Sequence, residues 1–138
     1  MSSLVARWSS WSPYFLSLLR IMAGFLFIQY GTTKLLGFPA PVMPDGSTAP
    51  VTSLPGVAGL FEMVGGTLML VGLFSRPVAF VLSGQMAAAY FMVHASQGFW
   101  PVLNGGTPST LFCFIWLYIS SAGPGPWSVD ALMSRKRA

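Results

Sequence analysis

Few side chains in this sequence can transfer a proton, and three of them stand within or beside long apolar runs. Glu62 interrupts the run at 56–74, Lys34 lies near the end of an earlier run, and His94 lies at the end of a later one. Carboxylates and imidazoles are frequent general acids and bases in enzymes. We therefore take Glu62 and His94 as candidate catalytic residues, and Lys34 as a candidate partner of Glu62.

Helical geometry predicts that more polar groups gather near these residues. If the first helix ascends and the second descends, Lys34 and Glu62 lie at similar depth and form an ion pair. His94 lies four residues beyond Tyr90, on the same helix face. The sequence thus predicts one cluster in the external half of the molecule, in which the candidate catalytic residues are joined by the cofactor-binding candidates Tyr30, Lys34, Tyr90 and Asn104.

A purely structural interpretation stands beside the catalytic one. Buried ion pairs often only fix the register of packed helices, so Lys34 and Glu62 fit that role equally well. His94 at a helix end fits an interfacial position where water satisfies its ring. Gln85 lies opposite His94 on an ideal helix, so it joins the same cluster only if the helix is kinked.

Arg20 is a third charged side chain inside an apolar run, and we expect a structural role for it. Its long side chain suits either an extension toward the cytoplasmic surface or an ion pair with Asp130. Asp130 fits an ion pair with Arg76 equally well. The sequence leaves this choice open.

Composition predicts the elements that position these residues. The 138 residues contain seven Lys and Arg and three Asp and Glu, and 54% are hydrophobic, which is too little charge to coat a soluble protein. A crossing helix needs about 20 apolar residues. We expect an all-α membrane protein, a single domain over 1–138 with a bundle of four transmembrane helices at about 13–37, 56–74, 78–95 and 108–122, and a short amphipathic C-terminal segment.

The positive charges predict the orientation of this bundle. With four crossings, Arg7, Arg76 and the run from Arg135 to Arg137 all fall on one side, which the positive-inside rule assigns to the cytoplasm. Both termini are then cytoplasmic. A cleaved signal peptide is the alternative interpretation of the N-terminus, but the first apolar run is too long for one.

Cysteine and histidine content excludes several cofactors. A single cysteine, Cys113, and a single histidine, His94, leave no set of side chains for a zinc site, an iron–sulfur cluster or a bis-histidine haem within one chain. No flavin motif is evident, and the basic residues lie beside an apolar body, which favours a membrane anchor over nucleic-acid binding. The glycines of the apolar runs indicate close helix packing.

Four segments, in their order and spacing, resemble the DoxX family of small bacterial membrane proteins. They are RIMAGFLFIQYGTTKLLGFP, FEMVGGTLMLVGLFSRP, YFMVHASQGFWPVLNGG and GPGPWSVD. The resemblance implies a four-helix protein of the bacterial inner membrane. The positions that match the family pattern are Arg20, Gly31, Lys34, Glu62, Gly72, Arg76, His94, Asn104 and Asp130, whereas Thr107 and Pro126 replace an acidic and a basic residue of many relatives.

The resemblance also implies a link to quinone-associated oxidation or to oxidative-stress complexes. One expectation is a quinone-binding redox subunit, in which His94 or Tyr30 hydrogen-bonds a quinone carbonyl and Glu62 passes protons. The other is a non-catalytic membrane anchor or assembly subunit that binds an oxidoreductase partner, in the membrane or in solution. A transporter is a weaker alternative, because four helices enclose little volume unless the chain oligomerises. The sequence does not decide whether the protein forms a homo-oligomer.

Overall fold

The computed structural model describes residues 2–138, which form helices and loops without a strand. The α-helices are α1 (Ser3–Ser9), α2 (Ser12–Leu35), α3 (Leu54–Val71), α4 (Ser75–Ala89), α5 (Pro101–Asn104), α6 (Thr107–Ala122) and α7 (Val129–Arg137). Helix α4 continues through a π-helical turn (Tyr90–His94) and a 3₁₀ turn (Ala95–Gln97). The all-helical prediction is therefore confirmed for the described part of the chain.

Three helical segments of residues 2–138 are long and apolar enough to cross a membrane. They are Ser3–Leu35, which joins α1 to α2, Leu54–Val71, and Ser75–Gln97, which joins α4 to its irregular turns. Helix α6 has 16 residues and is shorter than these three. Helix α1 was not predicted, because a run of seven residues with one arginine carries no clear apolar face.

Local chemistry explains where the central helices begin and end. The Ser53 hydroxyl accepts a hydrogen bond from the Gly56 backbone N–H (3.2 Å), which caps α3 at its start. Gly72 ends α3 in the left-handed conformation, with φ of 74°, a conformation that glycine adopts without the steric cost of a side chain. Phe74 shares that conformation, with φ of 52°, and the chain turns there directly into α4.

The α2–α3 loop folds back on the end of α2. The Ala49 N–H donates to the carbonyl of Lys34 (2.7 Å), one of the carbonyls that the helix end leaves free. Within the loop, the hydroxyl and N–H of Ser47 donate to the Asp45 carboxylate (2.6 and 2.9 Å). These bonds, that of the hydroxyl first, lower the pKa of Asp45 below its ordinary value.

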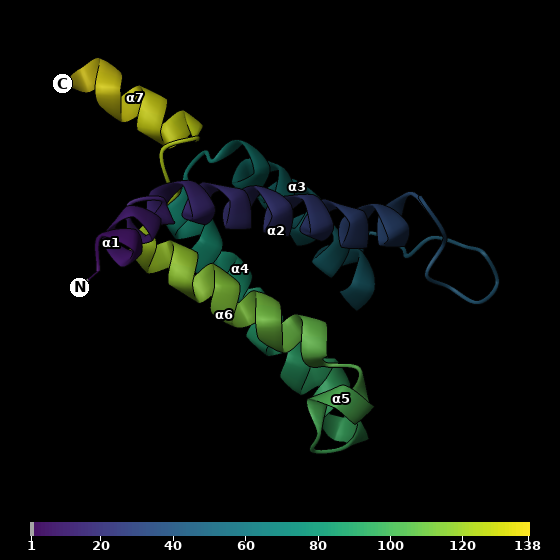
Figure 1. The fold of residues 1–138 in the computed structure, drawn as a ribbon. Helices are drawn as coiled ribbons and strands as arrows, with labels where there is room; N and C mark the ends of the chain where they lie inside the picture. Colours follow the sequence, from purple (N-terminus) through teal and green to yellow (C-terminus); the bar gives the residue numbers. More distant parts are fainter. Residues whose placement is uncertain (1) are drawn as a thin grey trace.

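The helices pair into two arms that separate toward one end (Figure 1). Helices α2 and α3 form the first arm, and α4 and α6 form the second. Both chain termini, α1 and α7 lie where the arms meet, which we call the terminal end. The α2–α3 loop and α5 lie at the opposite, loop end, each at the tip of its own arm.

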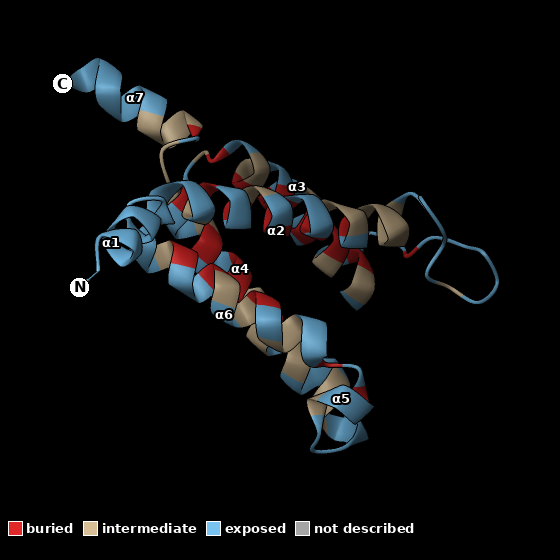
Figure 2. Cartoon of the chain, in the orientation of Figure 1, coloured by how far each residue is buried: buried red, intermediate tan, exposed pale blue. Residues whose placement is uncertain are grey.

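Glycines close the first arm, and bulky side chains fill the junction of the two arms. A Cβ built on Gly24 falls 2.8 Å from the Gly66 carbonyl oxygen, so the two backbones touch. At the junction, Phe27 of α2 meets the rings of Phe112 and Trp116 of α6 at centroid distances of 5.1 and 5.4 Å. Figure 2 shows buried residues along the inner faces of the helices, while the outer faces are exposed.

Arg20 ties the terminal end together, and neither of its predicted roles is observed. It is fully buried, its Nε donates to the Met69 carbonyl of α3 (2.8 Å), and its Nη atoms donate to the carbonyls of Pro124 and, at 2.6 Å, Trp127. The C-terminal segment crosses α2 closely enough to supply these carbonyls, because Gly125 packs on Ser17 and Pro13.

Asp130 and Arg76 cap helices at the same end instead of pairing with each other. The Asp130 carboxylate accepts hydrogen bonds from the Phe74 and Ser75 N–H groups (2.9 and 2.8 Å), at the start of α4. Arg76 donates to the carbonyls of Ser120 (3.3 Å) and Ser121, at the end of α6. Each charge thus lies at the helix terminus whose dipole it complements.

Candidate functional site

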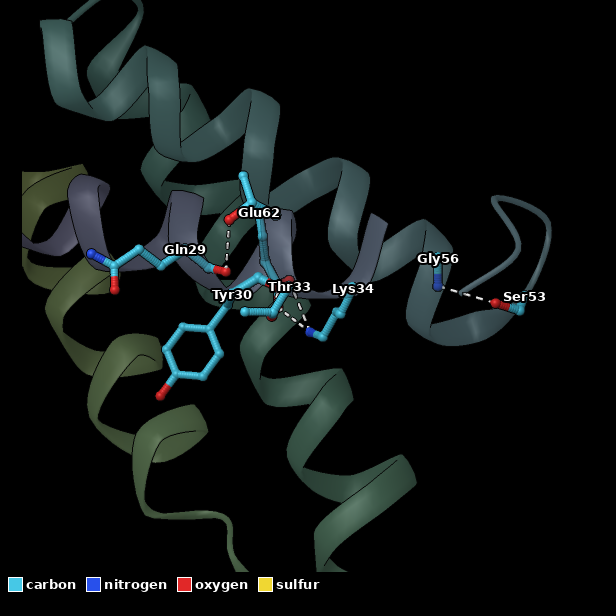
Figure 3. Close-up of polar contacts among 8 residues, drawn as sticks. Gln29, Tyr30, Thr33, Lys34, Ser53, Gly56 and Glu62 are labelled. Atoms are coloured by element: carbon cyan, nitrogen blue, oxygen red, sulfur yellow. Dashed lines mark hydrogen bonds and ion pairs between the residues drawn. The ribbon is translucent and has the colours of Figure 1, made fainter. Parts of the chain in front are cut away.

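The predicted ion pair between Lys34 and Glu62 is present. The Lys34 Nζ lies 2.6 Å from Glu62 Oε1 and 2.8 Å from Oε2, so one ammonium group binds both carboxylate oxygens. Figure 3 shows the two side chains meeting between α2 and α3. The Glu62 side chain is 4% exposed and that of Lys34 is 20% exposed, which leaves the carboxylate almost closed to other partners.

Small residues on both helices permit this contact. A Cβ built on Gly31 falls 2.8 Å from the Gly59 carbonyl oxygen, and one on Gly59 falls 3.3 Å from the Lys34 Cβ. The helix axes therefore approach closely within one turn of the ion pair. The loop that caps Lys34 through Ala49 covers the same end of α2.

A second polar group surrounds Asn104, at the tip of the other arm. Asn104 is 4% exposed, and its side-chain amide donates to the Gly98 carbonyl (2.8 Å) and the Tyr90 hydroxyl (3.3 Å), while its side-chain oxygen accepts from the Gly106 N–H (2.8 Å). His94 Nδ1 lies 3.0 Å from the Asn104 backbone carbonyl oxygen. These hydrogen bonds of Asn104 therefore fix the conformation of the segment that connects α4 to α6.

The π-helical turn positions Tyr90 and His94 for these contacts. It spans Tyr90–His94 and places more residues in a turn than an α-helix does, so it changes the direction of every side chain beyond it. The ring of Tyr90 packs over Gly106, where a Cβ falls 2.6 Å from the Tyr90 ring. The sequence prediction assumed regular α-helical spacing between Tyr90 and His94 and therefore did not include this turn.

The structure does not gather the six predicted site residues into one cluster. Lys34 and Glu62 lie in the first arm, whereas Tyr90, His94 and Asn104 lie at the far tip of the second (Figure 1). The prediction treated the helices as parallel rods. The helices instead pack closely in two pairs, and the two pairs separate toward the loop end.

Tyr30 belongs to the first arm and packs against the second. Its ring meets Phe112 of the second arm edge-on, at a centroid distance of 6.0 Å, and the residue is 43% exposed. In Figure 3 its hydroxyl points away from Glu62 and Lys34. Tyr30 is thus the predicted site residue that reaches from one arm to the other.

Gln85 is a polar residue that the sequence prediction left out of the site. Its amide nitrogen and oxygen are buried and have no hydrogen-bond partner among residues 2–138. Gly65 and Leu82 touch across α3 and α4. Glu62 lies three residues from Gly65 toward the loop end of α3, and Gln85 lies three residues from Leu82 toward the loop end of α4. Because the two helices are antiparallel, Glu62 and Gln85 therefore lie at the same depth. A buried amide without a hydrogen-bond partner lowers the stability of the fold, and such a group is a candidate contact for a bound ligand.

A quinone in the predicted set of six residues does not fit this geometry. A bound ring needs hydrogen-bond donors around one slot, but Lys34 donates to Glu62 and the His94 Nδ1 faces a backbone carbonyl on the other arm. Among residues 2–138, the buried side-chain donors without a protein partner lie outside this set, in the Gln85 amide, the Trp116 indole and the Ser75 hydroxyl.

Comparison with known proteins identifies the family. A protein of Haemophilus influenzae, described as uncharacterized, is 42% identical over 127 residues, which cover 90% of this chain and 94% of the relative. An uncharacterized membrane protein of Mycobacterium tuberculosis is 26% identical over 133 residues, covering 86% and 80%. No solved structure matches the chain. The DoxX family model matches residues 15–95, and the chain belongs to the DoxX family.

Proposed function

We propose that this DoxX-family membrane protein is a non-catalytic assembly subunit of a quinone-linked oxidoreductase or oxidative-stress system in the bacterial cytoplasmic membrane. The observation that supports this role is that the charged side chains of α2, α3 and α4 bind one another or backbone carbonyls. Lys34 binds Glu62, and Arg20 binds three carbonyls. Groups held in this way stabilise a scaffold, since a catalytic acid or base must reach a substrate.

Burial of Glu62 supports the same interpretation. Both oxygens accept hydrogen bonds from one ammonium group, and the side chain is 4% exposed. A proton carrier needs a second partner to receive the proton. The carboxylate of Glu62 instead joins α2 to α3, the role that buried ion pairs perform in helix registry.

The proposed topology has four crossings with both termini in the cytoplasm. Helix α6 runs back along α4 to the terminal end, so it returns the chain to the side from which α2 started (Figure 1). Its 16 residues span about 24 Å, and the adjoining segments extend it. Arg7, Arg76 and the basic end of α7 then lie on the cytoplasmic side, as the positive-inside rule requires.

Quinone binding is the second candidate function. Polar groups that lie near the depth of Glu62 in the bundle favour it. Gln85 supplies an amide without a protein partner, and Tyr30 supplies a hydroxyl beside the rings of the junction. Residues of this kind hold a quinone ring by one or two hydrogen bonds within apolar surroundings. In this alternative, Tyr30 keeps its predicted binding role and Glu62 its predicted catalytic role, with Gln85 as an added ligand. The roles predicted for Tyr90, His94 and Asn104 are not part of it, because these residues lie at the tip of the second arm.

The test is purification of the full chain in mild detergent from its native membrane, with mass spectrometry of both the proteins and the organic extract. The assembly role predicts a stoichiometric oxidoreductase partner that remains bound to the Gln85→Leu variant, and no quinone in proportion to the chain. Quinone at a near-stoichiometric amount, lost in Gln85→Leu and in Tyr30→Phe, would overturn the proposal in favour of the second candidate. A chain that purifies only as a homo-oligomer, without a partner, would also overturn it.

A further inference from the structure

The basic side chains of the chain divide into two groups by their contacts. Arg20, Lys34 and Arg76 bind carbonyl or carboxylate oxygens of the protein itself. The other four of the seven lie on the end helices, where Arg7 belongs to α1 and Arg135, Lys136 and Arg137 form the last turn of α7. All four are exposed, although Arg135 donates one hydrogen bond to the Pro126 carbonyl (3.1 Å).

Helix α7 carries these charges on a short amphipathic helix without protein cover. Val129, Leu132 and Met133 are spaced three and four residues apart, so they share one side of the helix. Leu132 is 55% exposed and Met133 is 38% exposed. Figure 1 shows α7 standing away from the four long helices. Its apolar side therefore needs cover from outside the chain.

The base of α7 is fixed to the body of the protein. The Ser128 hydroxyl accepts from the Ala131 N–H (3.1 Å), and the Asp130 N–H donates to the Gly72 carbonyl (2.9 Å). The Asp130 carboxylate binds the start of α4. Apart from the Arg135 bond to Pro126, these bonds hold only the first turn, so the side chains of Lys136 and Arg137 are free to meet a partner while the start of the helix stays in place.

Aromatic residues place that base at the level of lipid headgroups. Trp127 directly precedes the Ser128 cap and pairs with Tyr14 of α2 at a centroid distance of 5.4 Å. Trp8 and Trp11, which flank the junction of α1 and α2, are 67% and 56% exposed and stack on each other. Tryptophan and tyrosine concentrate at the membrane–water interface, where an apolar ring and a polar tip are both satisfied.

We infer that α7 is a docking surface for the anionic phospholipid headgroups of the membrane that the protein spans. Its three consecutive cations complement the negative surface of the leaflet, and its apolar side gains cover at the boundary of the acyl chains. The tryptophans beside it set its starting level at that boundary. The occupant is thus the bilayer itself and not a soluble acidic protein, which offers no cover of this kind at the headgroup level.

The experiment compares hydrogen exchange of the full chain in nanodiscs of phosphatidylcholine alone and of phosphatidylcholine mixed with phosphatidylglycerol. We expect the amides of α7 to exchange several-fold more slowly in the anionic discs at low salt, and this difference to shrink at high salt because counterions screen the attraction. Amides of α2 and α3 serve as the internal reference, since their exchange reports the stability of the body.

Two variants separate lipid docking from a general charge effect. Arg135→Gln with Lys136→Gln and Arg137→Gln should abolish the dependence on lipid composition and leave exchange in α2 and α3 unchanged. Leu132→Ser with Met133→Ser keeps every charge, and it should weaken the protection because the apolar contact is lost. Equal exchange of wild-type α7 in both kinds of disc, or full protection in the Leu132 and Met133 variant, would overturn the inference. Neither result depends on the proposed assembly role.

Discussion

At the scale of single residues, Lys34 and Glu62 show how much a charged pair inside an apolar arm constrains the protein. Each oxygen of Glu62 has the same ammonium partner, at 2.6 and 2.8 Å. Removing one member of a buried pair costs more than the pair itself contributes, because the remaining charge keeps its burial cost without compensation. Substitutions at this pair should therefore act mainly on stability.

A charge swap tests the contact directly. We expect Lys34→Glu or Glu62→Lys alone to lower the free energy of unfolding by about 3 kcal/mol, and the double change to recover a large part of that loss. Denaturation in mild detergent by titration with a harsh one measures these values. If the double variant is no more stable than the single ones, the two side chains do not interact in solution.

Glu62→Gln separates the structural role from the catalytic one. The amide keeps the volume but leaves the Lys34 ammonium without a counter-charge, so we expect the free energy of unfolding to fall by about 2 kcal/mol. Partner binding should fall only as far as this loss of folded protein explains. The comparison needs both unfolding and co-purification measured on the same preparation. A variant of wild-type stability that has lost quinone-linked activity would instead identify Glu62 as a proton carrier.

Arg20 should matter more than any other charge at the terminal end. It is fully buried and joins α2 to α3 and to the C-terminal segment through Met69, Pro124 and Trp127. Arg20→Ala removes the donor from one buried and two partly buried carbonyls, and we expect it to cost at least about 3 kcal/mol. Arg7→Gln, at an exposed position, is the control and should change stability little. A mild effect of Arg20→Ala on thermal unfolding would contradict this account.

At the scale of elements, the two arms are held together by different means. Helices α2 and α3 touch through glycine backbones, whereas α4 and α6 meet through larger groups such as the Ser83 hydroxyl, which donates to the Cys113 carbonyl (2.8 Å). Glycine contacts are intolerant of added volume because backbone atoms cannot move aside. The change in stability caused by a Gly→Ala substitution therefore distinguishes glycines at helix contacts from glycines that face lipid.

Two alanine substitutions provide a matched comparison. Gly31→Ala places a methyl group 2.8 Å from backbone atoms of Gly59 and Met63, and we expect it to destabilise the protein by about 1–3 kcal/mol. Gly84→Ala meets open space on α4 and should raise stability by up to about 1 kcal/mol through helix propensity. Equal effects in an unfolding assay would show that α2 and α3 are not packed at Gly31.

The elements themselves were largely predictable from the sequence. Apolar runs bounded by Pro13, Pro55, Pro77 and Pro108 predicted four helices whose starts agree with α2, α3, α4 and α6 to within three residues. Three features were missed, and one of them is the short helix α5, which lies between two predicted helices. The π-helical turn at Tyr90–His94 depends on hydrogen bonding that no spacing rule indicates, and α1 is too short to show a period.

At the scale of the whole molecule, the terminal end is a closed hub and the loop end is open. Arg20, Arg76 and Asp130 connect α2, α3, α4, α6 and the C-terminal segment at one end, while the two polar groups at the other end bind only within their own arms. This asymmetry places α1 and α7 on the same side. The proposed topology, with an even number of crossings, agrees with this placement.

Cysteine labelling tests that topology. In a Cys113→Ser background, Ser2→Cys and Ser134→Cys should react with a membrane-impermeant maleimide only after intact cells are opened, whereas Ser47→Cys in the α2–α3 loop should react in intact cells. All three substituted residues are exposed, so access is decided by the membrane and not by the fold. Opposite labelling of positions 2 and 134 would exclude four crossings.

The sequence by itself determined that this is a helical membrane protein and which charges it must shelter, since apolar length and the cost of a buried charge act locally along each helix. It also determined the Lys34–Glu62 pair, because two antiparallel neighbours joined by one loop have few registers. Only the tertiary structure decided that the arms diverge, that Arg20 binds carbonyls of the C-terminal segment, and that Asn104 lies far from Glu62. These outcomes depend on the crossing angles between helices, which are set by contacts among side chains distant in the chain.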